Sequence, residues 1–270
     1  MPGLTPHEQL TQRAGVAEVT SSRLHIEGFL RESAKAVLVA LARNPNLQER
    51  DLLRLLERND LPQEVVRELA THPEVARHYT VRLAVVRHPR TPRLISLPLM
   101  KFLHLFDLVR VCQTPAVPAD VKMVAEETVL KRLEGLPRGE RITLARRGTG
   151  RMAAAVLPCD DAELVRAALE NPYLTEAHLL KVLGQEDLPA TVVEMLAAHE
   201  KWSCRYHLRL ALIRNPHTPL VRVLAFLPHL AVNDLRDICL DHHMPEQVRS
   251  YVLAHCARRL NKGRQPLAGE

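Results

Sequence analysis

The sequence predicts an all-α protein, a right-handed α-solenoid of helical hairpins arranged as two tandem halves. The main observation is a long internal repeat. The stretch Tyr79–Pro92, YTVRLAVVRHPRTP, returns 127 positions later as Tyr206–Pro219, YHLRLALIRNPHTP. The same offset pairs Asn44–Leu133 with Asn171–Leu260 without gaps, and about a third of those positions are identical. No segment has the strict apolar–polar alternation of a strand, so every element is expected to be a helix.

The repeated stretch contains eight identical residues, which we call the repeat signature. They are Tyr79, Arg82, Leu83, Ala84, Arg87, Pro89, Thr91 and Pro92, and they recur as Tyr206, Arg209, Leu210, Ala211, Arg214, Pro216, Thr218 and Pro219. A shorter step of 44 residues separates Asn44-Pro45 from His88-Pro89. Because two helices and two turns fill that length, we expect roughly three hairpins in each half.

The first element is expected to differ from the rest. His7–Leu30 occupies the place of Glu134–Leu157 but has almost no similarity to it, as is typical of the capping unit of a solenoid. Residues 1–6 are expected to be loose. The predicted organisation is therefore a first half at 1–133 that includes this cap, a second half at 134–260, and a flexible polar tail at 261–270.

The following helices are expected in pairs, one in each half. Paired leucines at i, i+1 and i+4 indicate one apolar helix face, and proline at a helix start loses no hydrogen bond. In chain order the expected helices and their counterparts are 38–43 and 164–170, 49–57 and 176–183, 62–71 and 189–199, the YxxRLAxxR helices, the leucine-rich helices after Pro92 and Pro219, 107–112 and 234–239, and 118–133 and 245–260.

These motifs resemble those of known helical-repeat families. Asn44–Glu49 and Asn171–Glu176 follow the pattern NPxL(T/Q)E, and Asp60-Leu61-Pro62 recurs as Asp187-Leu188-Pro189. Hairpins with such turns resemble HEAT-like repeats, and the short, proline-punctuated helices are similar to variant leucine-rich repeat proteins. The resemblance covers about residues 31–260 and implies a binding scaffold. It departs from the second family in lacking the cysteine cluster that can hold iron and sulfur there.

Composition limits the class of protein. Hydrophobic residues make up 46% of the 270 residues and aromatic residues only 3%, so the expected core consists of leucine, valine and alanine. The net charge of +6 permits an anionic partner without requiring one. The five cysteines form no CxxC pair and no secretory signal is apparent, so we expect a cytoplasmic protein. The most apolar stretch, Leu94–Val109, is interrupted by Pro98, Lys101 and Asp107, so no membrane span is expected.

The arginines of the repeat signature are the first candidate site. Arg82, Arg87, Arg209 and Arg214 could form a ladder that holds phosphates or acidic peptide side chains. The interpretation we favour is structural: Arg82 and Arg209 bond to a neighbouring hairpin, at Asp60 and Asp187 or at turn carbonyls.

A second arginine-rich segment joins the two halves. The sequence RGERITLARRGTGR places a Gly-x-Gly turn among basic residues, and such a turn could present backbone amides to an anion. The spacing and the lysine of a P-loop are absent, which favours a helix–turn–helix connection with solvated arginines. The arginines of this candidate anion or nucleic-acid site are Arg138, Arg141, Arg146, Arg147 and Arg151.

An apolar stripe is the candidate partner-binding surface. Leu99, Phe102, Leu103 and Phe106 have the i, i+3, i+4, i+7 spacing of one helix face. The second half lacks phenylalanine at the positions of Phe102 and Phe106. The stripe therefore either packs the halves together or binds a partner helix or peptide.

No metal site or catalytic set is predicted. Cys239, His242, His243, His255 and Cys256 are ligand types that suit zinc, but Cys239 corresponds to Cys112 in the expected core. No nucleophile, base and orienting group can be assembled. We therefore expect a non-enzymatic scaffold without a cofactor that binds a protein or peptide. Nucleic-acid binding through arginines is the alternative, and end-to-end assembly is a third.

Overall fold

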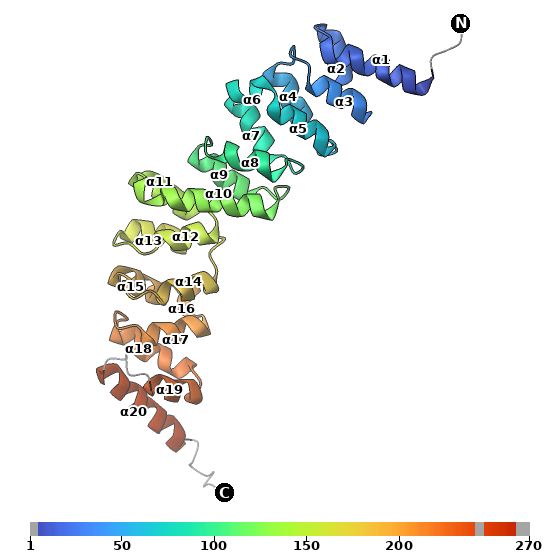
Figure 1. Ribbon diagram of the computed structural model, residues 1–270. Coiled ribbons are helices and arrows are strands. Elements are labelled where there is room, and N and C mark those ends of the chain that lie inside the picture. Colours follow the sequence, from blue (N-terminus) through green and yellow to red (C-terminus); the bar gives the residue numbers. More distant parts are fainter. Residues whose placement is uncertain (1–4, 241–245, 263–270) are drawn as a thin grey trace. The chain divides into compact units, whose positions relative to one another are not determined.

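A computed structural model describes residues 5–240 and 246–262, and these residues form twenty α-helices, two short 3-10 helices and no strand (Figure 1). The all-α prediction is confirmed. The chain divides into two compact units, Met1–Arg132 (unit 1) and Leu133–Glu270 (unit 2).

The helices are short. Those of unit 1 are α1 (Pro6–Val19), α2 (Arg23–Phe29), α3 (Lys35–Ala42), α4 (Glu49–Leu56), α5 (Gln63–Thr71), α6 (Pro73–Arg77), α7 (Tyr79–Arg87), α8 (Arg93–Met100), α9 (Leu105–Gln113) and α10 (Ala119–Arg132). Those of unit 2 are η1 (Leu133–Gly135), α11 (Arg138–Arg147), α12 (Gly150–Val156), α13 (Ala162–Leu169), α14 (Glu176–Leu183), α15 (Ala190–Ala198), α16 (Glu200–Ser203), α17 (Tyr206–Arg214), α18 (Leu220–Phe226), η2 (Leu227–His229), α19 (Val232–Cys239) and α20 (Glu246–Lys262).

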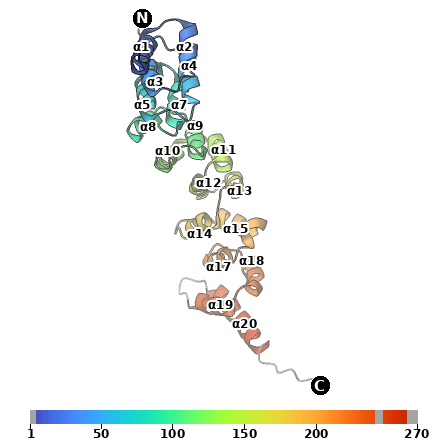
Figure 2. The ribbon, with the colours of Figure 1, turned by 90° about the vertical axis from the view of Figure 1, so that its right-hand side faces the viewer.

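Within each unit the longer helices pack in two layers. In unit 1, α3 packs against α1 and α5 in one layer, and α7 packs against α4 and α9 in the other. In unit 2, α13 packs against α11 and α15, while α14 packs against α12 and α17. Figure 2 shows α12, α14 and α17 along one side of unit 2 and α13, α15 and α18 along the other.

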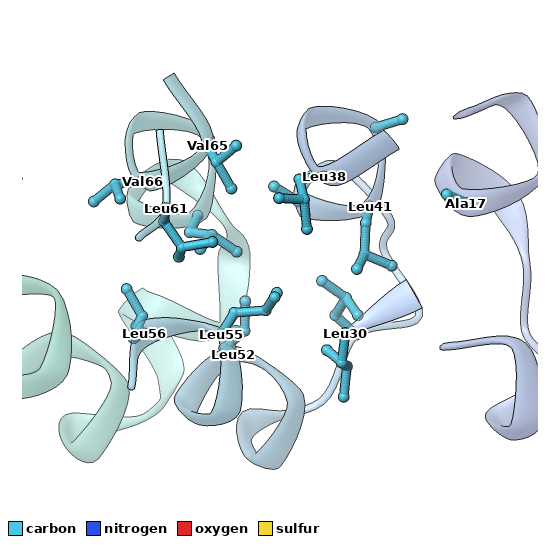
Figure 3. Close-up of a cluster of buried hydrophobic side chains, with 14 of the residues drawn as sticks. Ala17, Leu30, Leu38, Leu41, Leu52, Leu55, Leu56, Leu61, Val65 and Val66 are labelled. Carbon is cyan, nitrogen blue, oxygen red and sulfur yellow. The ribbon is translucent and has the colours of Figure 1, made fainter. Parts of the chain in front are cut away.

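The core lies between the layers. In unit 1, Leu38 and Leu41 of α3 face Leu52 and Leu55 of α4, and all four are almost completely buried (Figure 3). A single helix of this length could not bury its leucines alone. Packing between successive helices, rather than intrinsic helix propensity, therefore stabilises the unit.

The helix pairs are shorter than predicted. In unit 1, α1, α3, α5 and α8 begin about 29 residues apart, which is one pair of short helices with its turns. The step of 44 residues from Asn44 to His88 instead crosses four helices, α4 to α7, because Asn44 follows α3 in one layer and His88 follows α7 in the other. The prediction of three hairpins in each half is wrong.

Several smaller predictions also change. Pro62 and Pro189 are the N-caps of α5 and α15 rather than their first residues. The helices α6 and α16 were not predicted, since four or five residues are too few to show a periodicity. Helix α20 includes Asn261 and Lys262, which were assigned to the tail. The rest of that tail, residues 263–270, and residues 1–4 lie outside the described residues.

The two units have matching helix positions. Among the described residues, nine of the ten α-helices of unit 1 begin 127 residues before an α-helix of unit 2. The exception is α1, whose counterpart by order is α11. This is the segment in which the sequence similarity has disappeared.

Buried polar side chains connect each helix pair to the preceding one. The Asn44 amide donates to the carbonyls of Ala17 and Thr20 at 2.8 and 2.9 Å. The Asn171 amide donates to the carbonyls of Ala145 and Gly148 at 2.7 and 3.1 Å. Further bonds of this kind run from Arg58 to Leu30, from His72 to Asn44, from His88 to Arg58, from Arg132 to Leu103, from Trp202 to Leu169 and from Arg259 to Leu230. In each of these bonds the side chain belongs to the later residue and the carbonyl to the earlier one.

Candidate functional site

Half of the repeat signature holds the backbone in place. The Tyr79 hydroxyl donates to the Asp107 carboxylate and accepts from the His104 amide, and Tyr206 bonds in the same way to Asp234 and to the Ala231 amide. Burial and the hydrogen bond to Asp107 raise the pKa of Tyr79. These bonds hold the residues at the start of α9 and α19, each of which is the second α-helix after the tyrosine's own helix.

Arg82 and Arg209 also bind backbone. The Arg82 guanidinium donates to the Ala76 carbonyl at 2.8 Å, and Arg209 donates to the Ser203 carbonyl at 2.6 Å. Each guanidinium also stacks on an aromatic ring, that of Phe102 or that of Phe226. The carboxylate alternative is wrong for Arg82, because Asp60 forms its ion pair with Arg58.

The threonine and the second proline of the signature close the turn after α7. The Thr91 hydroxyl donates to the buried Val85 carbonyl, and Thr218 does the same to Leu212. Pro92 and Pro219 are the N-caps of α8 and α18. Four signature residues in each unit, the tyrosine, the first arginine, the threonine and this proline, therefore have structural roles.

The other four signature residues of unit 1 line a groove of about 420 Å³ between α4 and α7. We call it the α4–α7 groove. Its third wall is the turn after α9. The lining residues are Leu53, Leu56, Glu57 and Asn59 from α4 and the turn after it, Thr80, Leu83, Ala84 and Arg87 from α7, His88 and Pro89 from the next turn, and Thr114 and Ala116.

The floor of the groove is apolar and partly open to solvent. Leu53 and Ala84 are half-buried and pack against the core of unit 1, and Leu83 is half-buried beside them. Leu56 lies deeper, at 7% exposure. A ligand that covers this floor would remove apolar surface from water, which stabilises a complex by roughly 25 cal/mol per Å².

Two charged side chains stand at the rim. Glu57 is the C-cap of α4 and Arg87 is the last residue of α7, and both are exposed. Within the described part of the chain, neither side chain has a hydrogen-bonding or ion-pairing partner. The groove therefore presents one carboxylate and one guanidinium to an incoming ligand.

His88 adds no charge to the groove at neutral pH. Its ring is buried, with Nε2 at 3.0 Å from the Arg58 carbonyl and Nδ1 accepting from the Arg90 amide at 3.2 Å. Burial lowers the pKa of His88, and protonation of Nδ1 would destroy the hydrogen bond from Arg90. The imidazole is a structural part of the wall.

Unit 2 has the same floor at the same offset. Leu180, Leu210 and Ala211 are half-buried, and Arg214 is exposed at the end of α17. Two lining positions differ in charge: Gly184 takes the position of Glu57, and Glu186 takes that of Asn59. The counterparts of Thr114 and Ala116 are residues 241 and 243, which lie outside the described residues.

The arginine-rich segment forms the helix–turn–helix that was favoured, with α11 and α12 meeting at the Gly-x-Gly turn. Arg138 donates to the carboxylates of Asp161 and Glu163 at 2.6 and 2.7 Å, and the hydrogen bonds from Arg138 lower the pKa of Asp161 to about 2. The Gly148 amide donates to the Leu144 carbonyl, and both Gly148 and Gly150 are buried. The amides of the Gly-x-Gly turn are therefore not presented to solvent, and anion binding through the exposed arginines of the segment stays a prediction.

The glycines of that turn permit close packing instead. A Cβ atom on Gly150 would lie 2.2 Å from the Tyr173 carbonyl oxygen, and one on Gly148 would lie 2.5 Å from the Leu144 carbonyl oxygen. The other arginines of the segment vary in exposure: Arg141 is half-buried, and Arg146, Arg147 and Arg151 are exposed.

The predicted apolar stripe is not one helix face. Leu99 belongs to α8, Phe102 and Leu103 lie in the turn that follows it, and Phe106 belongs to α9. Leu103 is a core residue at 2% exposure, whereas Phe102 is 62% exposed. The spacing assumed a continuous helix, whereas α8 ends at Met100, so the helix-face prediction is wrong and partner binding by Phe102 and Phe106 stays a prediction.

The cysteine and histidine group gives no metal site among the described residues, in which no cluster of three or more potential ligands occurs. His242 and His243 lie outside those residues. Burial raises the pKa of Cys112 to about 12 and also raises the pKa values of Cys239 and Cys256, so these thiols are poor nucleophiles.

Comparison with protein-family models, with curated proteins and with solved structures gives no match for this chain. The resemblance to HEAT-like and variant leucine-rich repeats therefore remains a prediction. In the described part of the chain, no helix is both long and apolar enough to cross a membrane.

The groove was only partly visible in the sequence. Arg87 was considered as a phosphate or acid ligand, but Leu53, Leu56 and Glu57 were assigned to helix packing. Two features of the sequence could have indicated the groove. Leu83, Ala84 and Arg87 are identical in both copies, and no aspartate or glutamate lies three or four residues from Arg87 to pair with it.

Proposed function

We propose that the chain is a non-enzymatic helical-repeat scaffold that binds a peptide segment of a partner protein in the α4–α7 groove. In this proposal the units arose by tandem duplication and stack their helix pairs as a right-handed, HEAT-like solenoid. The shared helix starts at an offset of 127 residues and the recurring Tyr–Asp, Arg–carbonyl and Thr–carbonyl bonds support the duplication.

One observation carries the binding function. Four of the eight signature residues hold the turns and helix starts, and the remaining four, Leu83, Ala84, Arg87 and Pro89, all line the groove. Packing accounts for the buried part of Leu83 and Ala84, and the helix dipole favours any cation at the end of α7, but neither is a reason for an unpaired arginine in particular. A ligand in the groove provides that reason.

The groove is suited to side chains of a peptide. Pockets for small ligands are concave and mostly apolar, with a few polar groups that fix orientation. A volume of about 420 Å³ accommodates one or two side chains, and the half-buried leucines provide the apolar surface. Because Arg87 and Glu57 stand at the rim, polar parts of the bound segment stay near solvent.

Nucleic-acid binding is the weaker alternative. Affinity for a phosphate backbone depends on several cations that are free to replace counterions. The groove has one arginine opposite one glutamate, and Arg138 is already paired with two carboxylates. Arg146, Arg147 and Arg151 remain exposed, and binding through them would weaken steeply as salt is added.

The test begins with a library of random dodecapeptides displayed on phage and selected against the full chain. Selected peptides are synthesised, and their affinities are measured by fluorescence anisotropy. Ala84→Lys should prevent binding to unit 1, because lysine favours a helix, its aliphatic stem can lie along the apolar floor, and its side chain would occupy the groove. Ala211→Lys is the matched change in unit 2, and circular dichroism verifies that each variant stays helical.

We expect the wild-type chain to bind the selected peptides and Ala84→Lys to lose those specific to unit 1. If the double variant Ala84→Lys/Ala211→Lys binds every selected peptide as tightly as the wild type, the groove is not the peptide site. Binding of a fluorescent DNA or RNA duplex at 150 mM salt would instead favour the nucleic-acid alternative.

A further inference from the structure

The α4–α7 groove also indicates what its ligand must contain. We propose that the bound segment places a carboxylate against Arg87 and an adjacent apolar side chain on the leucine floor. This inference rests on the proposed peptide-binding function and specifies the chemistry of the peptide.

The position of Arg87 supports a carboxylate partner. It is the last residue of α7, it is exposed, and no described residue neutralises it. The two charged groups of the rim do not pair with each other, although both line the same groove. A guanidinium presents a planar fork of donors that matches a carboxylate, and charge-assisted hydrogen bonds of this kind are stronger than neutral ones.

The surroundings of Arg87 favour a single anionic group over a polyanion. Glu57 stands on the opposite wall, and His88 stays neutral because burial lowers its pKa. The remaining polar lining residues, Asn59, Thr80 and Thr114, carry no charge. A phosphate chain that reached Arg87 would bring further negative charge toward Glu57. A peptide can instead place one acidic residue at Arg87 and a neutral or basic residue at Glu57.

Glu57 sets a second preference of the groove in unit 1. Unit 2 has Gly184 at that position but Glu186 at the position of Asn59, so the effect of Glu57 is tested within unit 1. Loss of the Glu57 carboxylate removes the repulsion of an acidic residue at that end of the ligand. Glu57→Gly should therefore let the groove of unit 1 accept peptides with two acidic residues.

The experiment uses the selected peptides and the full chain. Peptides that Ala84→Lys excludes should be enriched in aspartate or glutamate next to an apolar residue. Replacing that acidic residue by its amide should weaken binding to the wild type by about five- to tenfold, as expected for a partly exposed charged pair. Arg87→Gln should weaken binding of the acidic peptide by a similar factor and leave the amide peptide unaffected.

A charge reversal gives the sharper test. Arg87→Glu should reject the acidic peptide and bind a version with lysine at the same position. Arg54→Gln is the control, because Arg54 is exposed on α4, has no described partner and lies outside the groove lining. It removes the same charge from the chain, so a loss in Arg87→Gln but not in Arg54→Gln identifies a local contact.

The outcomes separate the two proposals. If Ala84→Lys excludes the peptides but Arg87→Gln changes their affinities less than twofold, the groove binds peptides and the carboxylate inference is wrong. If Ala84→Lys excludes none of the selected peptides, the groove is not the site and both proposals fail.

Discussion

The buried asparagine of unit 2 allows the most direct test of how the helix pairs are joined. Asn171 is fully buried, and its side chain makes three hydrogen bonds. The amide nitrogen donates to the carbonyls of Ala145 and Gly148 at 2.7 and 3.1 Å, and the side-chain oxygen accepts from the Tyr173 amide at 2.7 Å. Asn171→Ala removes all three bonds without changing the backbone.

The expected cost follows from these contacts. A hydrogen bond contributes a net of about 1 kcal/mol, and a buried group left without a partner costs about 1–3 kcal/mol. The bonds to Ala145 and Gly148 are buried, whereas the bond from Tyr173 is partly accessible to water. We therefore expect Asn171→Ala to lower the free energy of unfolding of unit 2 by about 3 kcal/mol. In urea this corresponds to a shift of the midpoint by about 1–2 M.

The assay uses the single tryptophan of the chain, Trp202, which is buried in unit 2 and donates to the Leu169 carbonyl. Its fluorescence reports unfolding of unit 2, and far-ultraviolet circular dichroism reports both units. Asn44→Ala makes the matched change in unit 1, and Asn233→Ala changes an exposed asparagine of unit 2. A loss below 1 kcal/mol for Asn171→Ala, or one equal to that of Asn233→Ala, would refute the reasoning.

Three further predictions follow from the geometry. Burial lowers the pKa of His88, so the folded protein favours the neutral ring. The stabilisation that the neutral ring provides is complete above about pH 6.5 and is lost as the pH falls below that value. The stability advantage of the wild type over His88→Asn should therefore shrink between pH 7.5 and pH 5 in urea titrations. Tyr79→Phe removes the bonds to Asp107 and to the His104 amide and should cost about 2 kcal/mol by the same measurement. Gly150→Ala should lower the stability seen by Trp202 fluorescence by about 2–3 kcal/mol, because the new methyl group would overlap a backbone carbonyl oxygen.

Each of these variants has a control in the chain. Asn215 occupies the position of His88 in unit 2 and accepts the equivalent turn amide, so asparagine suits the turn but does not titrate. A constant difference between wild type and His88→Asn across the pH range would contradict the first prediction. Tyr206→Phe should cost as much as Tyr79→Phe, and a neutral effect of either would contradict the second. Gly139 has open space around it, so Gly139→Ala should be neutral or stabilising; an equal loss in both glycine variants would contradict the third.

The sequence predicted the helices well where a local signal marks each end. Proline and Asn-Pro sequences mark the ends of the helices. Because the pattern recurs after 127 residues, each of these marks occurs in both halves. Helix α14 was predicted with the bounds that the structure has, because its leucine spacing and its Thr175 cap both point to the same start. The helices α6 and α16 are only one turn long, so their sequences contain no period.

The groove could not be predicted in the same way. Its walls come from three separate places in the chain, α4, α7 and the turn after α9, and their approach depends on tertiary packing. The error at Phe102 has the same origin. Its spacing from Leu99 fits one helix face, but the chain turns between them, so Phe102 is exposed while Leu103 enters the core. Helical spacing therefore predicts a shared face only for residues that belong to the same helix.

The side chain–carbonyl hydrogen bonds that join helix pairs all have the same direction along the chain. In each bond described above, the later pair supplies a side-chain donor and the earlier pair supplies a carbonyl. As the chain is synthesised from its N-terminus, the acceptors of these bonds are carbonyls of helices already made, which water can solvate until the donor arrives. Removing pairs from the two ends is therefore unequal. Loss of the later pair exposes carbonyls to water, whereas loss of the first pair exposes a side-chain donor, the Asn44 amide, whose acceptors were the carbonyls of Ala17 and Thr20.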